Sequence, residues 1–403
     1  MRYLITEQTR LIYHNEEYQL ISVKDALENL NKESIWGTDT ETFGFDPYTR
    51  DLFTVQIGNY EDQYCIDIAT VSIKLFKDFF EDPNKLFIFH NAKFDLRFFY
   101  HQRIVIKNVY DTFLVKKLLW LGTPPGVHRM GLNDLCEENF GVTLDKSVRK
   151  GIGHSGLTPQ VIVYACDDVK YLIALRELQL EKVKEENLVV AMNIENSFVR
   201  VLAYIEYSGM KLDVSRWKDK MAKDLMSLKE AEEELNKWVL DHNDERFIHT
   251  ELQGSLFEGF SEPKCNINWN SSKQVVPFLK SLGFNLSVFD KRTNKNKYSV
   301  EAPIIEKQKD ISTITDPYLR YSTAQKVVST YGQSFINSIN PVSGKIHTQF
   351  DQLKETTRMG SGGTDKDTGQ RNINFQNIPG DEPTRSSFVP DKGNLFICAD
   401  YAA

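Results

Sequence analysis

The sequence predicts an α/β domain, followed by a mainly helical region and then by the first part of a second sheet. Residues 1 to about 190 alternate short apolar runs with helical patterns, which is typical of helices packed on a central mixed sheet. Residues 191–340 are mainly helical in their periodicity. Residues 341–403 are rich in Gly, Thr, Asn and Asp until the apolar run LFICAD, which predicts a strand. We therefore expect three regions, 1–190, 191–340 and 341–403.

The individual elements follow from these patterns in chain order. In the first region the apolar runs predict strands, and the longer amphipathic stretches between and after them predict helices. We expect strands over 52–58, 64–70 and 85–90, and helices over 72–80, 92–102, 112–121 and 132–141. Further helices are expected over 195–213, 215–242 and 318–338. Residues 243–315 are less regular.

Composition and charge place the chain among soluble globular proteins. No apolar run reaches the roughly 18 residues that a membrane span needs, so we expect no membrane partner and a cytoplasmic location. The 5 cysteines include no CxxC pair and are expected to be reduced thiols. The net charge of −7 argues against a surface that binds nucleic acid everywhere, although local basic faces remain compatible with it.

Acidic residues occur where a buried strand and the start of a helix are expected. Asp39 and Glu41 lie two positions apart, and they share one face of the strand because side chains alternate along it. Buried charge is costly unless it is paired or binds a metal. Asp95 falls in the first turn of a helix that Asn91 is expected to cap. Taken singly, Asp95 is explained by the helix dipole alone.

A third acidic position lies on a later helix. Tyr164 and Asp168 are four residues apart, which places them on one helix face, and Thr158 and Pro159 mark the start of that helix. Taken alone, this is an ordinary helical pair. Together, four carboxylates offer the oxygen ligands that Mg²⁺ or Mn²⁺ prefers. Two such ions, about 3.5–4 Å apart, can hold the attacking water and the leaving oxygen of a phosphodiester.

The three motifs DTET, HNAKFD and YACDD, in this order, resemble the exonuclease motifs of the DEDD superfamily. The resemblance implies a ribonuclease H-like fold and 3′-5′ exonuclease activity. It assigns Asp39, Glu41, Asp95 and Asp168 as ligands of two divalent ions, and it places Tyr164 as the residue that orients the attacking water. Asn91 and Phe94 are then expected to hold the single strand, whereas core packing is the favoured explanation for Phe98.

The remainder of the chain resembles the family A DNA polymerases. The segments ENSFVRVLAYIEYSGMKLD, NWNSSKQVVPFLKSLGF and TAQKVVSTYGQSF are similar to the start of that polymerase region and its thumb. The resemblance implies contacts to a DNA primer-template. NFQNIP and RSSFVPDKGNLFICADY are similar to later motifs, which implies DNA contacts for Gln376 and Asn377 and a metal-binding role for Asp400. Lys326 is expected to contact phosphates.

Several departures from the family pattern limit this expectation. KETTRMGSGG stands where the family has a Thr-Gly-Arg motif, with Arg358 as the arginine and Thr357 in place of the glycine. The chain stops at Ala403, without the fingers helix and the second palm aspartate. We therefore expect no primer extension by this chain alone, and a second polypeptide could complete the polymerase domain. The lack of an early flap-endonuclease-like domain is more typical of phage enzymes.

Two other functions remain open from the sequence. One is a stand-alone 3′-5′ exoribonuclease of the ribonuclease D type, although its RNA-binding domain would carry none of the polymerase-like segments. The other is a non-catalytic subunit that clamps DNA and whose acids are inert. Degradation of DNA compared with RNA would separate the first alternative, and metal titration would separate the second.

Overall fold

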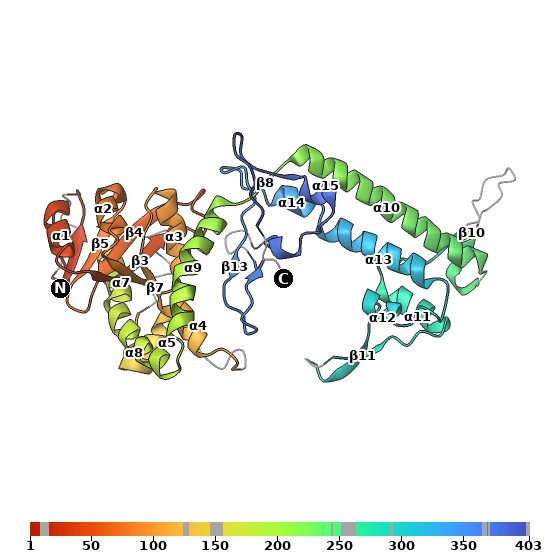
Figure 1. Cartoon of the computed structure of the whole chain (residues 1–403), viewed down its shortest axis with the longest axis horizontal. Coiled ribbons are helices and arrows are strands. Elements are labelled where there is room, and N and C mark those ends of the chain that lie inside the picture. Colours follow the sequence, from red (N-terminus) through yellow and green to blue (C-terminus); the bar gives the residue numbers. More distant parts are fainter. Residues whose placement is uncertain are drawn as a thin grey trace. The chain divides into compact units, whose positions relative to one another are not determined.

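The computed structural model describes residues 1–8, 16–123, 129–145, 156–242, 245–250, 263–290, 293–364, 369 and 371–399. The chain forms two compact units (Figure 1). Unit 1 consists of Met1–Met210 and Ile339–Asn377, and unit 2 consists of Lys211–Ser338 and Ile378–Ala403. These units describe packing, so the functional boundaries expected near residues 190 and 340 stay predictions.

A mixed sheet is the centre of unit 1, with strand order β2-β1-β5-β4-β3-β6-β7. Its strands are β1 (Arg2–Ile5), β2 (Gln19–Leu20), β3 (Ile35–Thr42), β4 (Leu52–Gly58), β5 (Gln63–Asp67), β6 (Leu86–Phe89) and β7 (Val109–Asp111). β3 is antiparallel to β4, with Asp39 opposite Gln56. It pairs with β6 only from Ile35 to Gly37, so its last residues lie beyond that ladder.

Helices cover both faces of this sheet. They are α1 (Val23–Leu30), α2 (Lys77–Glu81), α3 (Ala92–His101), α4 (Thr112–Leu119), α5 (Leu132–Phe140), α7 (Pro159–Lys170), α8 (Leu172–Glu185) and α9 (Val189–Ser208). Figure 1 shows α1, α2 and α3 on the opposite side of the sheet from α7 and α8. The core between the layers is apolar and largely aromatic, and Phe80, Phe87, Phe89 and Phe99 are fully buried in it.

The later part of unit 1 adds two short paired strands, β13 (Phe350–Asp351) and β14 (Gly360–Ser361). Two isolated bridges accompany them, from Ile346 to Met210 and to Ile339. Residues 339–377 are therefore attached to the end of α9 by backbone hydrogen bonds, although more than 100 residues separate them in the chain.

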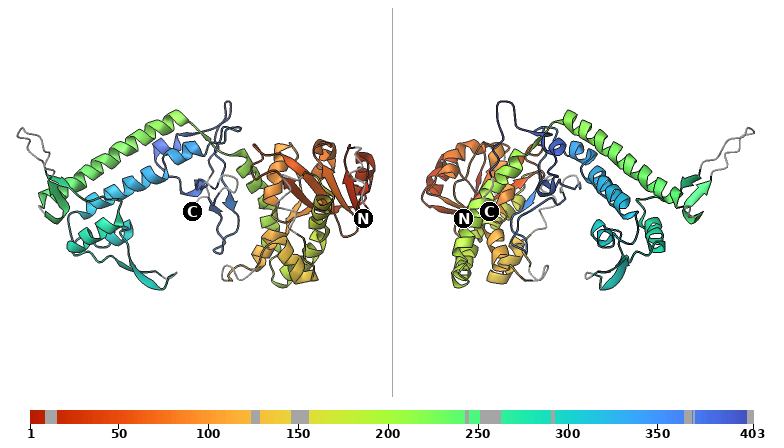
Figure 2. Two further views of the ribbon diagram at one scale, coloured as in Figure 1. Left: turned by 180° about the vertical axis from the view of Figure 1, so that it is seen from behind. Right: turned by 45° about the vertical axis from the view of Figure 1, so that its right-hand side comes forward.

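Unit 2 is built on two helices that run side by side, α10 (Val214–Asp241) and α13 (Thr315–Thr330) (Figure 2). Its other elements are β8 (Lys211–Leu212), β9 (Ile248–Thr250), β10 (Pro263–Cys265), α11 (Ser272–Ser281), β11 (Ser287–Asp290), β12 (Lys295–Tyr298), α12 (Ala302–Glu306), α14 (Gln333–Asn337), α15 (Glu382–Arg385) and β15 (Phe388–Val389). Its core is centred on Trp269 and Phe278, packed against Leu235 of α10. In the described residues, no helix combines the length and the apolar character that a membrane crossing requires.

Most expected elements occur where the patterns place them, with four differences. The helix expected over 195–213 ends at Ser208, and Lys211–Leu212 form the strand β8. The helix expected over 318–338 is interrupted at Gly332, which begins the separate helix α14. The pattern at 72–80 forms a short 3-10 helix over Ile73–Phe76 before α2. The strand expected in LFICAD is wrong for the described residues 395–399, because no described strand pairs with them and a strand exists only in a ladder.

Candidate functional site

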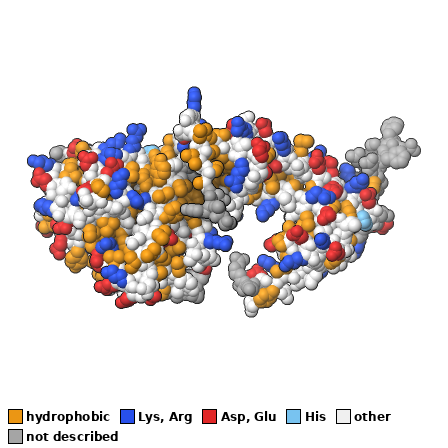
Figure 3. Space-filling model, in the orientation of Figure 1, with side chains coloured by type: hydrophobic (Ala, Val, Ile, Leu, Met, Phe, Trp, Pro, Cys, Tyr) orange, Lys and Arg blue, Asp and Glu red, His pale blue; other side chains and the backbone are white. Residues whose placement is uncertain are grey.

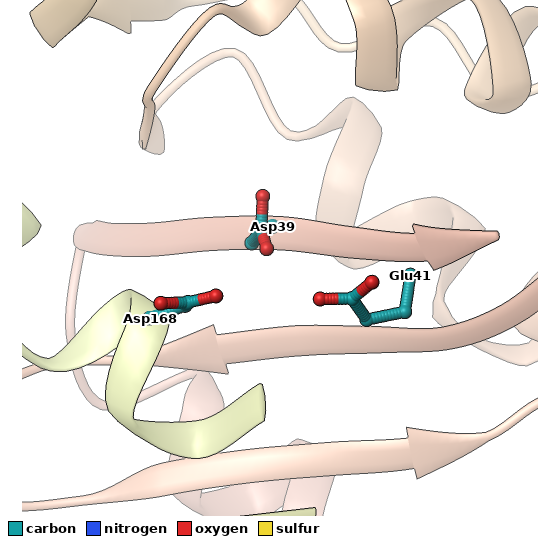
Figure 4. A group of neighbouring side chains, drawn as sticks. All are labelled: Asp39, Glu41 and Asp168. Carbon is teal, nitrogen blue, oxygen red and sulfur yellow. The ribbon is translucent and has the colours of Figure 1, made fainter. Parts of the chain in front are cut away.

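Three of the predicted acids meet in unit 1. Asp39 and Glu41 extend from β3, and Asp168 reaches them from α7 (Figure 4). One carboxylate oxygen from each lies within 4.8 Å of the others. Glu41 and Asp168 are 9% and 7% exposed, so these charges are held in a largely buried place. Three negatively charged carboxylates this close together repel one another. A hard divalent cation between them would offset that repulsion and accept their oxygens as ligands.

A pair of glycines allows α7 to approach the sheet this closely. Gly37 of β3 lies opposite Gly58 of β4. A Cβ added at Gly37 would lie 2.6 Å from the Val169 carbonyl oxygen, and one added at Gly58 would lie 2.7 Å from a Val169 methyl. Val169 directly follows Asp168. Because neither glycine has a side chain, α7 can pack close enough to β3 for Asp168 to lie beside Asp39. The sequence analysis did not identify either glycine.

Tyr164 lies one turn before Asp168 on the same helix and faces the acid cluster. Its side chain is 5% exposed, and it forms a hydrogen bond with Asp168. Burial raises the pKa of Tyr164 far above its ordinary value, and the negative charges of Asp168, Glu41 and Asp39 raise it further. The phenol therefore stays protonated near neutral pH and can donate a hydrogen bond. The expected start of α7 is confirmed, because the Thr158 side chain accepts from the Val161 N–H and Pro159 follows it.

Asp95 is buried, and it is not one of the three acids that meet within 4.8 Å in the described residues. Its carboxylate accepts a 2.6 Å hydrogen bond from the hydroxyl of Thr40, the residue between Asp39 and Glu41. Burial raises the pKa of Asp95 to about 7, and the nearby charge of Asp111 adds to this shift. Thr40 thus ties α3 to β3, a role that sequence reasoning missed.

The start of α3 is capped differently from the expectation. Asn91 adopts a left-handed backbone with φ 75°, and its side chain makes no capping hydrogen bond, so the predicted cap is wrong. The backbone N–H groups of Asn91 and Ala92 donate to the carboxylate of Asp111, each at 2.9 Å. Asp111 also accepts from the first N–H groups of α4. A single buried carboxylate satisfies the N-termini of two helices, which no local pattern predicts.

Phe98 and Phe94 of α3 differ in burial. Phe98 is 2% exposed and packs in the core, which confirms the core assignment. Phe94 is half-buried, with its ring 5.9 Å from that of Phe45. The Asn91 side chain is exposed. Both remain accessible, so their contacts to a strand stay a prediction.

The residues predicted from the polymerase-like segments lie apart from the acids in the chain. Lys326 of α13, Arg358, Gln376 and Asn377 are exposed. Asp400 lies outside the described residues. Thr357 has φ 63°, in the left-handed region that favours glycine. The position where the sequence departs from the family's glycine therefore keeps the backbone that a glycine would adopt.

Two family models match separate parts of the chain. Residues 18–184 match the family model described as 3′-5′ exonuclease. Residues 247–403 match the model described as DNA polymerase family A. The chain therefore contains a 3′-5′ exonuclease domain and a region of the DNA polymerase family A, which confirms the two resemblances predicted from the sequence.

Relatives and solved structures extend this result. The DNA polymerase I of Borreliella burgdorferi is 27% identical over 96% of this chain and 41% of its own length. That of Bacillus subtilis is 29% identical over 90% of this chain and 38% of its own length. The chain thus spans about two fifths of these relatives. The POL domain of Pol1 from M. smegmatis, in complex with DNA primer-template and dNTP, shares the fold with a TM-score of 0.67 at 18% identity, over 98% of this chain and 59% of that one. The predicted fold class is confirmed.

Proposed function

We propose that this chain is the proofreading portion of a family A DNA polymerase, and that residues 1–190 hydrolyse the phosphodiester at the 3′ end of DNA. The observation that carries the proposal is the meeting of Asp39, Glu41 and Asp168 within 4.8 Å, inside the region that matches a 3′-5′ exonuclease family. Residues 191–340 then act as a thumb-like region, and residues 341–403 as the start of a palm.

The donor set fits divalent metal ions. The three clustered carboxylates supply hard oxygen ligands in a largely buried place, and Asp95 is tied to the same strand through Thr40. We propose two ions, Mg²⁺ or Mn²⁺, held by Asp39, Glu41, Asp95 and Asp168. When bound, such ions lower the pKa of water and neutralise charge on the leaving oxygen.

The chain's own residues orient the reactants. The phenol of Tyr164 lies beside the acids and is hydrogen-bonded to Asp168. We propose that its hydroxyl also orients the attacking water by a hydrogen bond. The half-buried ring of Phe94 lies on the helix that also carries Asp95, and Asn91 directly precedes that helix. They hold the 3′-terminal nucleotides, with the ring available to stack on a base.

DNA is the proposed partner of both units, as a single-stranded 3′ end and as a primer-template. Lys326, Arg358, Gln376 and Asn377 are exposed and so are accessible to the DNA backbone. We expect affinity that falls steeply with salt and varies little with sequence. Asp400 would be a metal ligand of the palm, and the site of action is the cytoplasm.

A second polypeptide that completes the polymerase domain is also proposed, and exposed apolar surface supports it. Val190, Ile194 and Val201, on one face of α9, are 72%, 60% and 50% exposed, and apolar side chains gather over this helix (Figure 3). In unit 2, Leu395 and Ile397 are 89% and 93% exposed. An exposed apolar face such as that of α9 is typical of a surface that a partner protein covers.

The experiment is degradation of single-stranded DNA carrying a 5′ label, with Mg²⁺ or with a chelator. The proposal predicts shortening from the 3′ end that requires the metal. Degradation of RNA with DNA left intact would favour the exoribonuclease. Absence of degradation, together with no uptake of metal by calorimetry, would favour a subunit with inert acids.

A further inference from the structure

A buried carboxylate in α9 holds two cations of α3. The Glu206 side chain is 1% exposed. Its Oε1 accepts from Lys93 Nζ at 2.6 Å, and its Oε2 lies 3.8 Å from Arg97 Nε. Lys93 and Arg97 are one turn apart on α3, so one carboxylate holds one side of that helix. Removing one partner of such a buried group leaves charge without compensation, which makes the contact costly to break.

The same carboxylate holds a segment from the region that matches the polymerase family. The Phe350 N–H donates to Glu206 Oε1 at 2.6 Å, and Lys93 Nζ donates to the Phe350 carbonyl. His347 Nδ1 lies 2.8 Å from the Glu206 carbonyl oxygen. We name Glu206, Lys93, Arg97 and the Phe350 backbone the Glu206 network. All of it lies within unit 1.

The helix held in this way carries Asp95, between Lys93 and Arg97 in sequence. Asp95 is joined to Thr40 of β3, and Thr40 separates Asp39 from Glu41. The network on one side and the Thr40 hydroxyl on the other therefore fix where α3 presents Asp95. A displacement of α3 changes the distance from Asp95 to the three clustered acids.

One ion pair of the Glu206 network, between Glu206 and Arg97, is too long for a hydrogen bond. Glu206 Oε2 and Arg97 Nε are both buried and make no hydrogen bond within the described residues, although they face each other. A charge-assisted hydrogen bond has a length of about 2.7–2.9 Å, so a shift of roughly 1 Å of α3 toward α9 would close it. Most buried polar atoms in proteins form hydrogen bonds, so a buried pair of charged atoms that forms none needs a functional or structural explanation.

We propose that Glu206 is a positioning residue of the exonuclease site: with the backbone of Phe350, it sets the place of α3 and hence of Asp95. The inference rests on the proposed exonuclease function and extends it, because a segment of the polymerase-family region then supports the nuclease site. Glu206 touches no reacting atom. Its effect is expected on metal binding, as for other residues that orient ligands.

The test is Glu206→Gln, which keeps the shape and removes the charge. We expect the Mg²⁺ concentration for half-maximal exonuclease rate to rise about tenfold, and Mn²⁺ affinity in calorimetry to fall by a similar factor. Glu81→Gln is the matched control, because Glu81 also pairs with a lysine and accepts from a backbone N–H, that of Val105. It should leave both quantities unchanged.

A second pair of variants tests the inference independently, in case Glu206→Gln fails to fold. Arg97→Met should weaken Mn²⁺ binding several-fold, by roughly three- to tenfold, and Arg97→Lys should restore most of it. A lowered Tm with wild-type metal affinity in Glu206→Gln or Arg97→Met would show a purely structural role and overturn the inference, while the exonuclease assignment stands. If the wild-type chain takes up no metal and degrades no DNA, the proposed function fails and the inference fails with it.

Discussion

At the scale of single residues, Gly37 decides whether the acids of β3 and α7 can meet. A methyl group at this position would lie 2.6 Å from the Val169 carbonyl oxygen, so Gly37→Ala must push α7 away from the sheet. We predict a loss of about 1–3 kcal/mol in the free energy of unfolding, as for other overpacked sites, and a large loss of exonuclease rate. Gly380→Ala is the control, since nothing lies within 4 Å of the added carbon, and it should change neither quantity. Equal behaviour of the two variants in denaturant titration and nuclease assays would contradict the assignment.

His347 makes a prediction about pH. Burial lowers its pKa below the ordinary value of 6.5, although the hydrogen bond to the Glu206 carbonyl opposes this. The unfolded chain therefore binds more protons than the folded chain at mildly acidic pH, so stability rises with pH and is lost as pH falls below about 6.5. Urea titrations between pH 5 and 8 should show this loss in the wild type and a weaker one in His347→Gln. Parallel pH curves for both would show that His347 titrates normally.

The residues of the candidate site differ in how far sequence can find them. Asp39, Glu41, Tyr164 and Asp168 stand in local motifs whose spacing places them on one strand face and one helix face. Thr40, Gly37 and Asp111 act through partners about 20 to 130 positions away, namely Asp95, Val169 and the N–H groups of Asn91 and Ala92. Such long-range contacts leave no periodic signal. Thr40 nevertheless lies between two recognised acids, and Gly37 lies two positions before the first of them, which is the signal that could have singled them out.

At the scale of elements, Thr357 tests the turn that precedes β14. A β-branched residue at φ 63° is strained by its Cβ, by roughly 1–2 kcal/mol. Thr357→Gly should therefore raise the free energy of unfolding, by an amount reduced to about 1 kcal/mol or less by the added freedom of the unfolded chain. Thermal unfolding of the two proteins checks this. A lower Tm in the glycine variant would mean that the threonine side chain makes a contact worth more than the strain.

The helices and strands were predicted correctly where the spacing of hydrophobic residues follows a single helical or strand period. The expected limits of β4, α4, α5 and α10 are close to the observed ones because hydrophobic spacing persists along each of them. Prediction failed at LFICAD, where apolar content alone indicated a strand but pairing decides. It also failed at Asn91, because the carboxylate of Asp111 from the next strand takes the place of a local cap.

At the scale of the whole molecule, the family matches and the packing divide the chain differently. Residues 339–377 fall within the polymerase-family match, yet they pack into the same unit as the exonuclease domain. Contacts such as Gln352 Nε2 to the Glu195 carbonyl, 2.8 Å long, join residues more than 150 positions apart. Composition and periodicity report neighbours in sequence, so they could not have predicted this association.

Primer extension tests the proposed division of labour. Nucleotidyl transfer with two metal ions needs at least two palm acids and a cationic grip on the triphosphate, and among residues 1–403 we propose one such acid, Asp400. We predict no synthesis by the 403-residue chain with Mg²⁺ and all four deoxynucleotides. Addition of a polypeptide that carries the fingers and further palm acids of this family should allow synthesis. Synthesis by residues 1–403 without any added partner would contradict the proposed role of Asp400.

The most direct measurement of the central claim concerns Asp39 and Glu41. The double variant Asp39→Ala, Glu41→Ala should lose metal-dependent shortening of single-stranded DNA from the 3′ end and lose calorimetric uptake of Mn²⁺, while circular dichroism stays that of the wild type. Changing Glu61 and Asp62, two acids of the turn between β4 and β5, to alanine should leave degradation and metal uptake intact. Wild-type degradation by the Asp39, Glu41 variant would contradict the claim that these acids hold the catalytic metal.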